Sequence, residues 1–316
     1  MLTVVMPNYN HARYLPEALE GLLRQTRRAD EIIVIDDAST DNSVAVIEPF
    51  LSRQQNIRLI RNEANQGVVA STNRGLKMAA GDLILFAAAD DVSYPRLIER
   101  ASALLADYPS ACLFSAQTDI MDAGGRSLGP LPAPVPLNEP GYIPPARVAE
   151  FLLEDDGWFS GNTTIWRTQM LREVGGFSAD LGSFADGFLY RKLALQHGAC
   201  FSPEVLSAWR RIEGGQAWTD TASVTRLHRV TTLARQKMES DPIFPRGYPA
   251  RWEGRHLFGA QRFNLIQARR QARKAGLLRW FGALAKEALL TPWLFASLRP
   301  RDVGAVINRR MRRAGR

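Results

Sequence analysis

Two adjacent carboxylates, Asp90 and Asp91, end the apolar run Ile84–Ala89. Such neighbours repel each other, so a fold that holds them side by side needs positive charge nearby. A divalent cation such as Mg²⁺ or Mn²⁺ meets this need, because it binds through one or two carboxylates and through substrate phosphates. An equally good interpretation is a turn in which an aspartate caps the helix that starts near Pro95. These residues alone favour neither interpretation.

A second acidic pair, Asp36 and Asp37, ends the apolar run that starts at Glu31. Acids at strand ends contact the ribose or base in dinucleotide folds, but the pattern G-x-G-x-x-G is missing from the first strand-to-helix turn, which argues against an NAD site. A receiver-type phosphoacceptor also carries acids at strand ends, although the chain length and the pair at 90–91 fit it poorly. The structural alternative is an Asx turn through residues 37–39.

Two further features give weaker signals. Asp186 stands at the start of an expected helix, where a lone aspartate is usually an N-cap. If its carboxylate faces the same crevice as the acidic pairs, it is a candidate general base. Arg210 and Arg211 follow an expected strand, where arginines either pair with phosphates or face solvent. Without further context the residues favour solvent.

The elements that position these side chains alternate along the first hundred residues. The expected strands are 2–7, 31–37, 57–62 and 81–91, and the expected helices are 14–25, 39–51 and 67–80. This rhythm predicts an α/β fold with a parallel sheet flanked by helices. Ligands of such sheets bind beyond the carboxyl ends of the strands. The polar residues at 8–10, 36–37 and 90–91 are therefore expected to converge on one crevice.

The rest of the chain is less regular. A helix over 97–105 and a strand over 110–121 are followed by the proline-rich segment 129–145, which predicts a long surface loop or flap. Helix and strand signals resume to about residue 211. Beyond residue 223 the pattern is helical and basic.

Composition places the chain among soluble globular proteins. It has 316 residues, which is enough for one large domain or a domain with an appendage, and 46% are hydrophobic. The two cysteines, Cys112 and Cys200, match no metal spacing and predict buried thiols in a reducing compartment. The first residues resemble a strand more than a secretory signal. No uninterrupted apolar window of 18 residues is present. We therefore expect a cytoplasmic protein.

Six segments occur together in the order and spacing of one enzyme family. They are VVMPNYNHARYLPEAL, IIVIDDASTDNS, NEANQGVVASTNRGLKMAAGDLILF, AADDVSYP, GNTTIWRTQMLREVGGF and ADGFLYRKLALQHG. Covering roughly residues 2–215, they resemble the family 2 nucleotide-sugar glycosyltransferases of the GT-A fold. The resemblance implies a Rossmann-like, mostly parallel sheet flanked by helices, with a C-terminal helical extension. It also implies inverting, metal-dependent transfer of a sugar from a nucleoside-diphosphate sugar to an acceptor hydroxyl.

The resemblance assigns the donor nucleotide to the first strand ends. It implies that Pro7, Tyr9 and Asp37 cradle the nucleobase. Asp36 lies beside them with a less defined role. Gly67 is expected where the loop after the third strand approaches the nucleotide.

The resemblance assigns the chemistry to three further acids. Asp90 corresponds to the metal-binding acid of the family's Asp-x-Asp element, with Asp91 close to it, and the expected cation is Mn²⁺ or Mg²⁺. Asp186 corresponds to the catalytic acid of the family's Glu-Asp element and would take the proton from the acceptor hydroxyl. Arg211, or its neighbour Arg210, is expected to stabilise the diphosphate.

Two positions depart from the family pattern. Ala88 replaces the first acid of the Asp-x-Asp element, and Ala185 replaces the first acid of the Glu-Asp element. These changes leave a catalytically silent nucleotide-sugar binding or scaffold protein as the alternative function. A Gln-x-x-Arg-Trp box and long membrane spans, which processive synthases carry, are absent from the sequence. We therefore expect single-sugar transfer, in the assembly of a surface polysaccharide or glycoconjugate, to a carbohydrate or lipid-linked saccharide acceptor.

The expected organisation is a catalytic domain over 1–220 and a basic, amphipathic helical extension over 221–316. The nucleotide-sugar half of the catalytic domain is about 1–120, and the acceptor half is about 121–220. Residues 251–316 hold 16 Lys and Arg against 3 Asp and Glu, which leaves 24 against 29 in the rest of the chain. The body is therefore mildly acidic and the tail strongly basic.

The tail has three interpretations. Residues 277–298 are apolar but interrupted by charges and a proline, which suits a helix in a membrane interface, with Trp280, Trp293 and Phe295 at headgroup depth. Residues 277–316 would then hold the protein on an anionic surface, at the inner face of the cell membrane. An equally good interpretation is a helical cap that packs on the catalytic domain. Nucleic-acid binding would use the same charge, but no recognised fold supports it.

Overall fold

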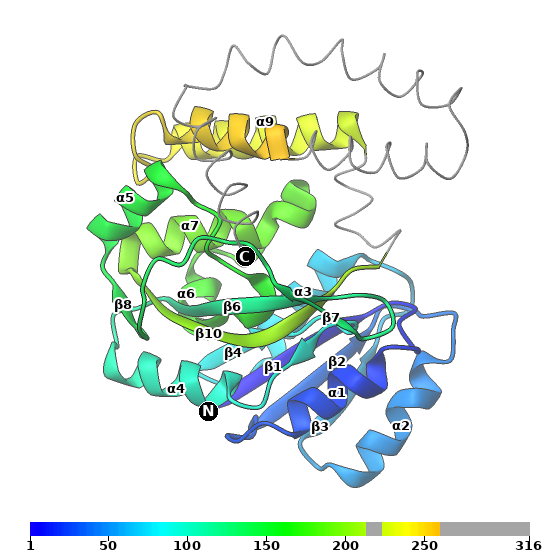
Figure 1. The fold of residues 1–316 in the computed structure, drawn as a ribbon. Helices are drawn as coiled ribbons and strands as arrows, with labels where there is room; N and C mark the ends of the chain where they lie inside the picture. The colour runs from blue at the N-terminus through cyan, green and yellow to red at the C-terminus, as the bar shows by residue number, and fades with distance from the viewer. Residues whose placement is uncertain (213–222, 260–316) are drawn as a thin grey trace. The chain divides into compact units, whose positions relative to one another are not determined.

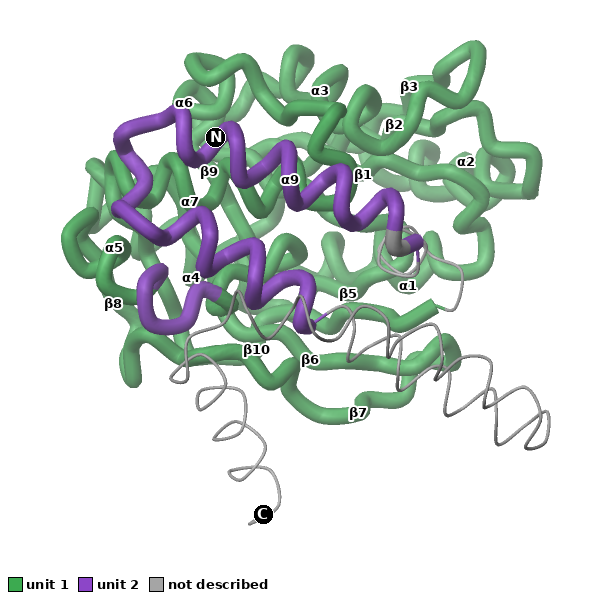
Figure 2. The backbone as a smooth tube through the Cα atoms, turned by 90° about the horizontal axis from the view of Figure 1, so that it is seen from above, with its two compact units in different colours: residues 1–151, 157–212 green, residues 152–156, 213–316 purple. Residues whose placement is uncertain are grey.

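The computed structural model describes residues 1–212 and 223–259 (Figure 1). The chain forms two compact units, which Figure 2 shows in different colours. Unit 1 contains residues 1–151 and 157–212, and unit 2 contains residues 152–156 and 213–316. The expected boundary near residue 220 and the expected membrane segment 277–316 lie outside the described residues, so both stay predictions.

Unit 1 is built on a 10-stranded sheet, whose first part has the order β3-β2-β1-β4 and is parallel throughout (Figure 1). Its strands are β1 (Leu2–Asn8), β2 (Glu31–Asp36), β3 (Ile57–Arg61) and β4 (Leu83–Phe86). The connecting helices are α1 (Leu15–Leu23), α2 (Ser43–Arg53) and α3 (Val68–Met78). Every strand and helix expected in this part is present, which confirms the predicted α/β class.

The strands of this part are apolar because helices cover both faces of the sheet. Val4 and Met6 of β1 share one core cluster with Leu15 and Leu19 of α1, and all four are fully buried. Val5 points to the other face, where Gly75 of α3 packs against its side chain. Two-sided burial of this kind requires near-continuous apolar strands. Truncating one of these side chains to alanine typically costs about 2–5 kcal/mol.

The second part of the sheet continues from β4 in the order β9-β6-β10-β5 and mixes strand directions. The strand β9 is antiparallel to both of its neighbours, whereas β6 and β10 are parallel to each other. The strands are β5 (Val92–Ser93), β6 (Leu113–Met121), β9 (Ile165–Arg167) and β10 (Ala199–Arg210). The other elements are α4 (Leu97–Asp107), α5 (Pro145–Glu154), η1 (Gly161–Thr163), α6 (Thr168–Glu173), η2 (Ala179–Phe184) and α7 (Ala185–His197).

The proline-rich segment 129–145 is partly built into the sheet. The strand β7 (Ser127–Pro130) pairs with β6, and β8 (Gly141–Ile143) pairs with β10. Residues 131–140 between them are irregular. The expected surface loop is therefore correct for the middle of the segment and wrong at both ends. Prolines suit such edge positions because they offer no N–H to a neighbouring strand.

The described part of unit 2 is helical, as the sequence predicts. The helix α9 (Val224–Ser240) begins at Ser223, whose hydroxyl accepts a hydrogen bond from Arg226 N. A second helical segment, 248–259, is joined to 152–156 by a hydrogen bond of 2.8 Å from the Tyr248 hydroxyl to Asp156 Oδ2. Within residues 1–212 and 223–259, no helix combines the length and the hydropathy needed to cross a membrane.

Cys112 and Cys200 are both free and buried, which confirms the expected buried thiols. Burial raises the pKa of both thiols. They are therefore protonated core side chains at neutral pH.

Candidate active site

Asp36 ends β2 and has no exposed surface. Its Oδ1 accepts a hydrogen bond from Asn8 Nδ2 at 2.9 Å, and its Oδ2 accepts one from Ser39 N at 3.2 Å. The first bond ties the ends of β1 and β2 together, and the second holds the turn that follows. This turn passes through Ala38 at a φ of 59°, which is uncommon for a residue other than glycine. Asp36 therefore lies beneath the site and fixes the backbone around it.

Asp37 fixes the loop that leads into α3. Its Oδ1 accepts hydrogen bonds from Asn62 Nδ2 at 2.6 Å and Gln66 N at 3.0 Å, and its Oδ2 accepts one from Gly67 N at 2.8 Å. Gly67 has a φ of 89°, which glycine adopts without strain. The first two polar clusters are therefore connected, as the strand order predicts. Tyr9 stands at the same edge with 42% of its surface exposed.

The second acidic pair lies in the turn between β4 and β5 and is held from β10. Arg210 N donates to Asp91 Oδ1 at 2.8 Å, and Arg210 Nε donates to the carbonyl oxygen of Asp90 at 2.7 Å. The same guanidinium pairs with Glu17 at 2.5 Å and lies 5.0 Å from the centroid of the Tyr14 ring. Arg210 is 3% exposed, so it positions the acidic turn from within the protein.

The carboxylates of this pair receive few hydrogen bonds. Within the described part of the chain, no hydrogen bond reaches the carboxylate of Asp90. Asp91 accepts from Arg210 N, and the side chain of Asn162 lies beside it. Burial raises the pKa of Asp91 well above its ordinary value, and the charge of Asp90 raises it further. The pair is therefore short of positive charge, as expected of two adjacent aspartates that accept few hydrogen bonds.

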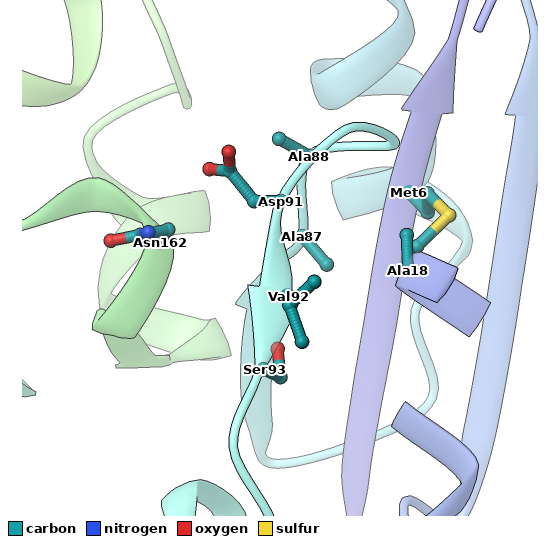
Figure 3. A pocket seen from close by; sticks show the side chains of 8 residues that line it. All are labelled: Met6, Ala18, Ala87, Ala88, Asp91, Val92, Ser93 and Asn162. Carbon is teal, nitrogen blue, oxygen red and sulfur yellow. The ribbon is translucent and has the colours of Figure 1, made fainter. Parts of the chain in front are cut away.

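The three alanines before this pair have different surroundings. Ala87 and Ala89 are buried, whereas Ala88 is partly exposed. Ala88, Asp91 and Asn162 line a small pocket (Figure 3). Figure 3 shows Asp91 pointing toward Asn162, while Ala87 points to the opposite side of the turn. The position where the family pattern has an acid therefore faces the pocket, and the small Ala88 side chain leaves room there.

A divalent cation fits this pair when other molecules supply most of its ligands. The described residues contain no group of three or more His, Cys, Asp or Glu side chains arranged to hold a metal. Asp90 and Asp91 nevertheless offer carboxylate oxygens that the protein leaves largely without donors. Mg²⁺ in particular is bound by one or two carboxylates together with phosphate oxygens and water. The residues present therefore fit a cation that is shared with a diphosphate.

Asp186 lies in the first turn of α7. Phe184 is the N-cap residue, so Asp186 is not the cap that its position in the sequence indicated. Gly187 N donates to its Oδ1 at 2.6 Å, and the Tyr190 hydroxyl donates to its Oδ2 at 2.5 Å. Burial raises the pKa of Asp186, and these two hydrogen bonds and the nearby Arg191 lower it. The result is a carboxylate with a stronger affinity for a proton than an exposed aspartate has.

The short helix η1 connects the two acidic sites. Asn162 contacts Asp91 and also donates from Nδ2 to Thr118 Oγ1 at 3.0 Å. The preceding residue, Gly161, packs on Asp186, because a Cβ built on Gly161 would lie 2.9 Å from Asp186 Oδ2. Two consecutive residues of η1 therefore contact Asp91, which is next to the metal candidate, and the candidate base Asp186. This arrangement brings the second acidic pair, Asp90 and Asp91, close to Asp186.

Some of these contacts have no signal in the sequence. The sequence offered the arginines at 210 and 211 as phosphate partners, but the side chain of Arg210 is occupied by Glu17 and the acidic turn. The side chain of Arg211 makes no hydrogen bond or ion pair within the described residues and stays the candidate for the diphosphate. Asn62, Asn162 and Tyr190 were not foreseen. The asparagines stand beside motif residues, but nothing in their spacing indicates their partners.

Comparison with known proteins finds similarity to one family. Residues 3–134 match the model of glycosyl transferase family 2. GlyG, a glycosyltransferase of Streptococcus pneumoniae, is 35% identical over 99 residues, and the uncharacterized glycosyltransferase YibD of Escherichia coli is 39% identical over 98 residues. These alignments cover 31% of this chain and 33% and 28% of the relatives, so they span about a third of the relatives' length. The uncharacterized protein MT1568 of Mycobacterium tuberculosis is 27% identical over 78% of this chain and 77% of its own.

Solved structures share the fold over nearly the whole chain. S. aureus TarS 1-349, in complex with UDP-GlcNAc, has a TM-score of 0.61 at 20% identity and covers 96% of this chain and 88% of its own. The mannosyltransferase PcManGT of Pyrobaculum calidifontis, in complex with GDP-Man and Mn²⁺, has a TM-score of 0.59 at 21% identity and covers 98% of this chain and 86% of its own. At these identities the likeness shows the fold. Residues 3–134 are thus similar to glycosyl transferase family 2, and the fold is of the GT-A type.

Proposed function

We propose that the protein transfers a single sugar from a nucleoside-diphosphate sugar to an acceptor hydroxyl, with inversion at the anomeric carbon. The observation that carries this proposal is the convergence at η1, where Asn162 contacts Asp91 and Gly161 contacts Asp186. A poorly satisfied acidic pair beside a buried carboxylate offers one site for the leaving diphosphate and one for the attacking hydroxyl. The match of residues 3–134 to glycosyl transferase family 2 supports the same reaction.

The donor is expected at the edge formed by β1, β2 and α3. Pro7, Tyr9 and Asp37 are the candidates for contact with the nucleobase, and Gly67 brings the α3 backbone to the nucleotide. The structural relatives were solved with UDP-GlcNAc and with GDP-Man, which supports a nucleoside-diphosphate sugar as donor class. Asp36 would act beneath them through Asn8 and Ser39.

Asp90, with Asp91 beside it, would hold Mn²⁺ or Mg²⁺. When bound, the cation supplies Lewis-acid stabilisation of the negative charge on the leaving diphosphate. Arg210 keeps the turn in place through the Asp90 carbonyl group and the Asp91 carboxylate. The side chain of Arg211 is the candidate for an additional contact to the diphosphate.

Asp186 would act as the general base. The acceptor oxygen attacks the anomeric carbon, its proton passes to the Asp186 carboxylate, and the bond from that carbon to the phosphate oxygen breaks. The electron pair of the broken bond stays on the diphosphate. A positioned carboxylate base typically contributes about 10²–10⁴-fold in rate. The acceptor is expected to be a carbohydrate or a lipid-linked saccharide in the assembly of a surface polysaccharide or glycoconjugate.

Thermal-shift measurements with UDP, GDP and their sugars, each with and without MnCl₂, test the donor class. A bound nucleotide raises the apparent stability by mass action. We expect a larger rise in Tm with Mn²⁺ present than without it. No shift with any of these nucleotides would contradict the proposal. Release of UDP or GDP from the donor that binds then tests turnover.

A catalytically silent nucleotide-sugar binding protein is the second candidate function. It is favoured by Ala88 and Ala185, which stand where the family pattern has acids. Ala185 is 4% exposed, so a methyl group is buried at the position where the family pattern has a carboxylate. This function would be favoured over transfer if the protein binds a donor without releasing nucleoside diphosphate. Its Asp186→Asn variant should then bind the donor in the same way as wild type.

The basic segment 277–316 is proposed to bind an anionic membrane surface. Its charge and its tryptophans support this proposal. Co-sedimentation with vesicles of phosphatidylglycerol and phosphatidylcholine is expected for the full chain and is expected to weaken when residues 277–316 are deleted. Equal co-sedimentation of both proteins would contradict the proposal.

A further inference from the structure

The candidate base Asp186 has a partner on its own helix that the proposed reaction does not yet use. Tyr190 stands four residues after Asp186, so the two side chains project from the same face of α7. The Tyr190 hydroxyl donates to Asp186 Oδ2 at 2.5 Å. Tyr190 is 5% exposed, and its hydroxyl therefore meets the carboxylate inside the protein.

The Tyr190 ring is held by stacking on two aromatic neighbours. Phe159 lies 5.2 Å away and Trp166 lies 5.1 Å away between ring centroids, each at an interplanar angle of 18°. Stacked aromatic neighbours restrict a ring to one orientation and add to its burial. The hydroxyl is therefore held at Oδ2 by the packing of the ring and needs no further ordering when a substrate arrives.

Gly161 closes the same side of the carboxylate. A Cβ built on this residue would lie 2.8 Å from the Tyr190 hydroxyl oxygen and 2.9 Å from Asp186 Oδ2, which is closer than real Cβ atoms come. The backbone of η1 thus covers Oδ2, and only glycine permits this approach. The other oxygen, Oδ1, accepts a hydrogen bond from Gly187 N at 2.6 Å and has a second lone pair.

We propose that Tyr190 is a positioning residue for Asp186, that its hydroxyl and the Gly161 backbone together occupy Oδ2, and that Oδ1 is the oxygen that receives the acceptor proton. This inference rests on the proposed function, because it assigns the geometry of the same base. It adds Tyr190 as a positioning residue and Asp186 Oδ1 as the proton acceptor, and neither the family pattern nor the sequence indicates them.

The hydrogen bond from Tyr190 affects the ionisation of Asp186 as well as the orientation of its carboxylate. A hydrogen bond to the charged form of a carboxylate favours that form and lowers its pKa. Among the described residues, the titratable or charged side chains that act on Asp186 are Tyr190 and Arg191 of α7, and η1 contributes none. Burial raises the pKa of Asp186, and Tyr190 counters this rise. Tyr190 thereby favours the ionised form of this base.

The test is Tyr190→Phe, which keeps the stacked ring and removes only the hydroxyl. In this variant the acid limb of the pH profile of kcat/KM is expected to move to higher pH by about one unit, which is about a tenfold loss of activity on the acid side. Tyr142→Phe is the matched control, since the Tyr142 hydroxyl also bonds to α7, at the carbonyl oxygen of His197, 3.0 Å away and at the other end of the helix. Its acid limb should stay in place.

A second measurement does not depend on turnover. Carboxyl ¹³C NMR of protein labelled at aspartate Cγ, with the Asp186 signal identified by its loss in Asp186→Asn, gives the titration midpoint directly. The midpoint is expected to rise in Tyr190→Phe and to stay in place in Tyr142→Phe. An unchanged midpoint in Tyr190→Phe overturns the inference. If the midpoint rises in Tyr190→Phe but the wild-type protein transfers no sugar, the contact is supported and the proposed function is contradicted.

Gly161→Ala tests the steric part. The added methyl group should displace the Asp186 carboxylate or the Tyr190 hydroxyl and lower kcat by at least about tenfold, while the affinity for UDP or GDP stays unchanged. Wild-type kcat in Gly161→Ala would overturn the assignment of Oδ2 as the covered oxygen.

Discussion

The dipeptide Asp-Asp occurs at the end of β2 and again in the turn between β4 and β5, and the two copies have opposite surroundings. Asp36 and Asp37 together accept five hydrogen bonds, from two asparagine side chains and three backbone N–H groups. Asp90 and Asp91 receive far fewer, and burial and mutual repulsion raise the pKa of Asp91. The first pair is satisfied by the protein. The second is left open to something positive from outside.

The difference shows that the neighbours of an acid, more than its position at a strand end, decide what it does. Asn8 and Asn62 turn the first pair into anchors for the loops around the nucleotide edge. The second pair has Arg210 nearby, but this arginine contacts the Asp90 backbone and Glu17 with its guanidinium. Two adjacent carboxylates with few donors favour a bound proton or a nearby cation. We therefore expect a cation at the second pair and not at the first.

The largest expected effect comes from the third carboxylate, which belongs with the open pair. Asp186→Asn should lower kcat by about 10²–10⁴-fold, because the amide accepts no proton. Binding of UDP or GDP with Mn²⁺ should be retained, because the proposed function gives Asp186 a role toward the acceptor and none in nucleotide binding. Steady-state kinetics together with a thermal shift by nucleotide separate these effects. Activity within a few fold of wild type would remove Asp186 from the mechanism.

The next largest effect should come from the satisfied pair. Asp37→Asn places an amide group against the N–H donors of Asn62, Gln66 and Gly67, and a buried donor left without an acceptor costs about 1–3 kcal/mol. The free energy of unfolding, measured by urea denaturation, should fall by about this amount. Unchanged stability would show that the loop between β3 and α3 does not depend on this carboxylate.

Asp91→Asn should act in the opposite direction. The folded-state pKa of Asp91 is raised, so the native protein binds more protons than the unfolded chain between the two pKa values. Stability is therefore lost as pH rises through this window, and the loss is complete above the folded-state pKa. Without divalent cations, the variant should have a higher Tm than wild type at pH 7.5, and the difference should vanish toward pH 3. A lower Tm at pH 7.5 would contradict the picture of an open pair.

Glu17→Gln should have the smallest effect. Glu17 pairs with the buried Arg210, but its own side chain is 54% exposed, so solvent screens the interaction. Exposed ion pairs are typically worth about 0.2–1 kcal/mol. We expect a loss of stability within this range and a modest weakening of Mn²⁺-dependent nucleotide binding, measured by titration calorimetry. A loss of binding as large as that of an Asp90 variant would show that Glu17 controls the acidic turn.

Sequence patterns predict the parallel part of the fold because its signals are local. Continuous apolar runs mark β1 to β4, and helical spacing marks α1, with Leu15, Leu19 and Leu22 on its buried face. The second part depends on contacts between distant segments. The strand β9 has only three residues and is defined by its antiparallel pairing with β4 and β6. No local pattern contains that information.

The same distinction holds for the site. The resemblance to a family located both acidic pairs and Asp186, but it did not separate the satisfied pair from the open one. That separation depends on contacts such as Arg210 with Asp91 and Asn162 with Asp91, which join segments far apart in the chain. The contact of Tyr190 with Asp186 spans only one helical turn, yet a tyrosine at that spacing is equally typical of a core position.

The central claim is that the open pair binds a cation and the satisfied pair does not. Electron paramagnetic resonance of Mn²⁺, titrated with protein and either UDP or GDP, measures this directly. Wild type and Asp36→Asn, with folding checked by circular dichroism, should both deplete the signal of free Mn²⁺ in the presence of nucleotide, and Asp90→Asn should not. Equal depletion by wild type and Asp90→Asn, or loss of depletion in Asp36→Asn alone, would contradict the account.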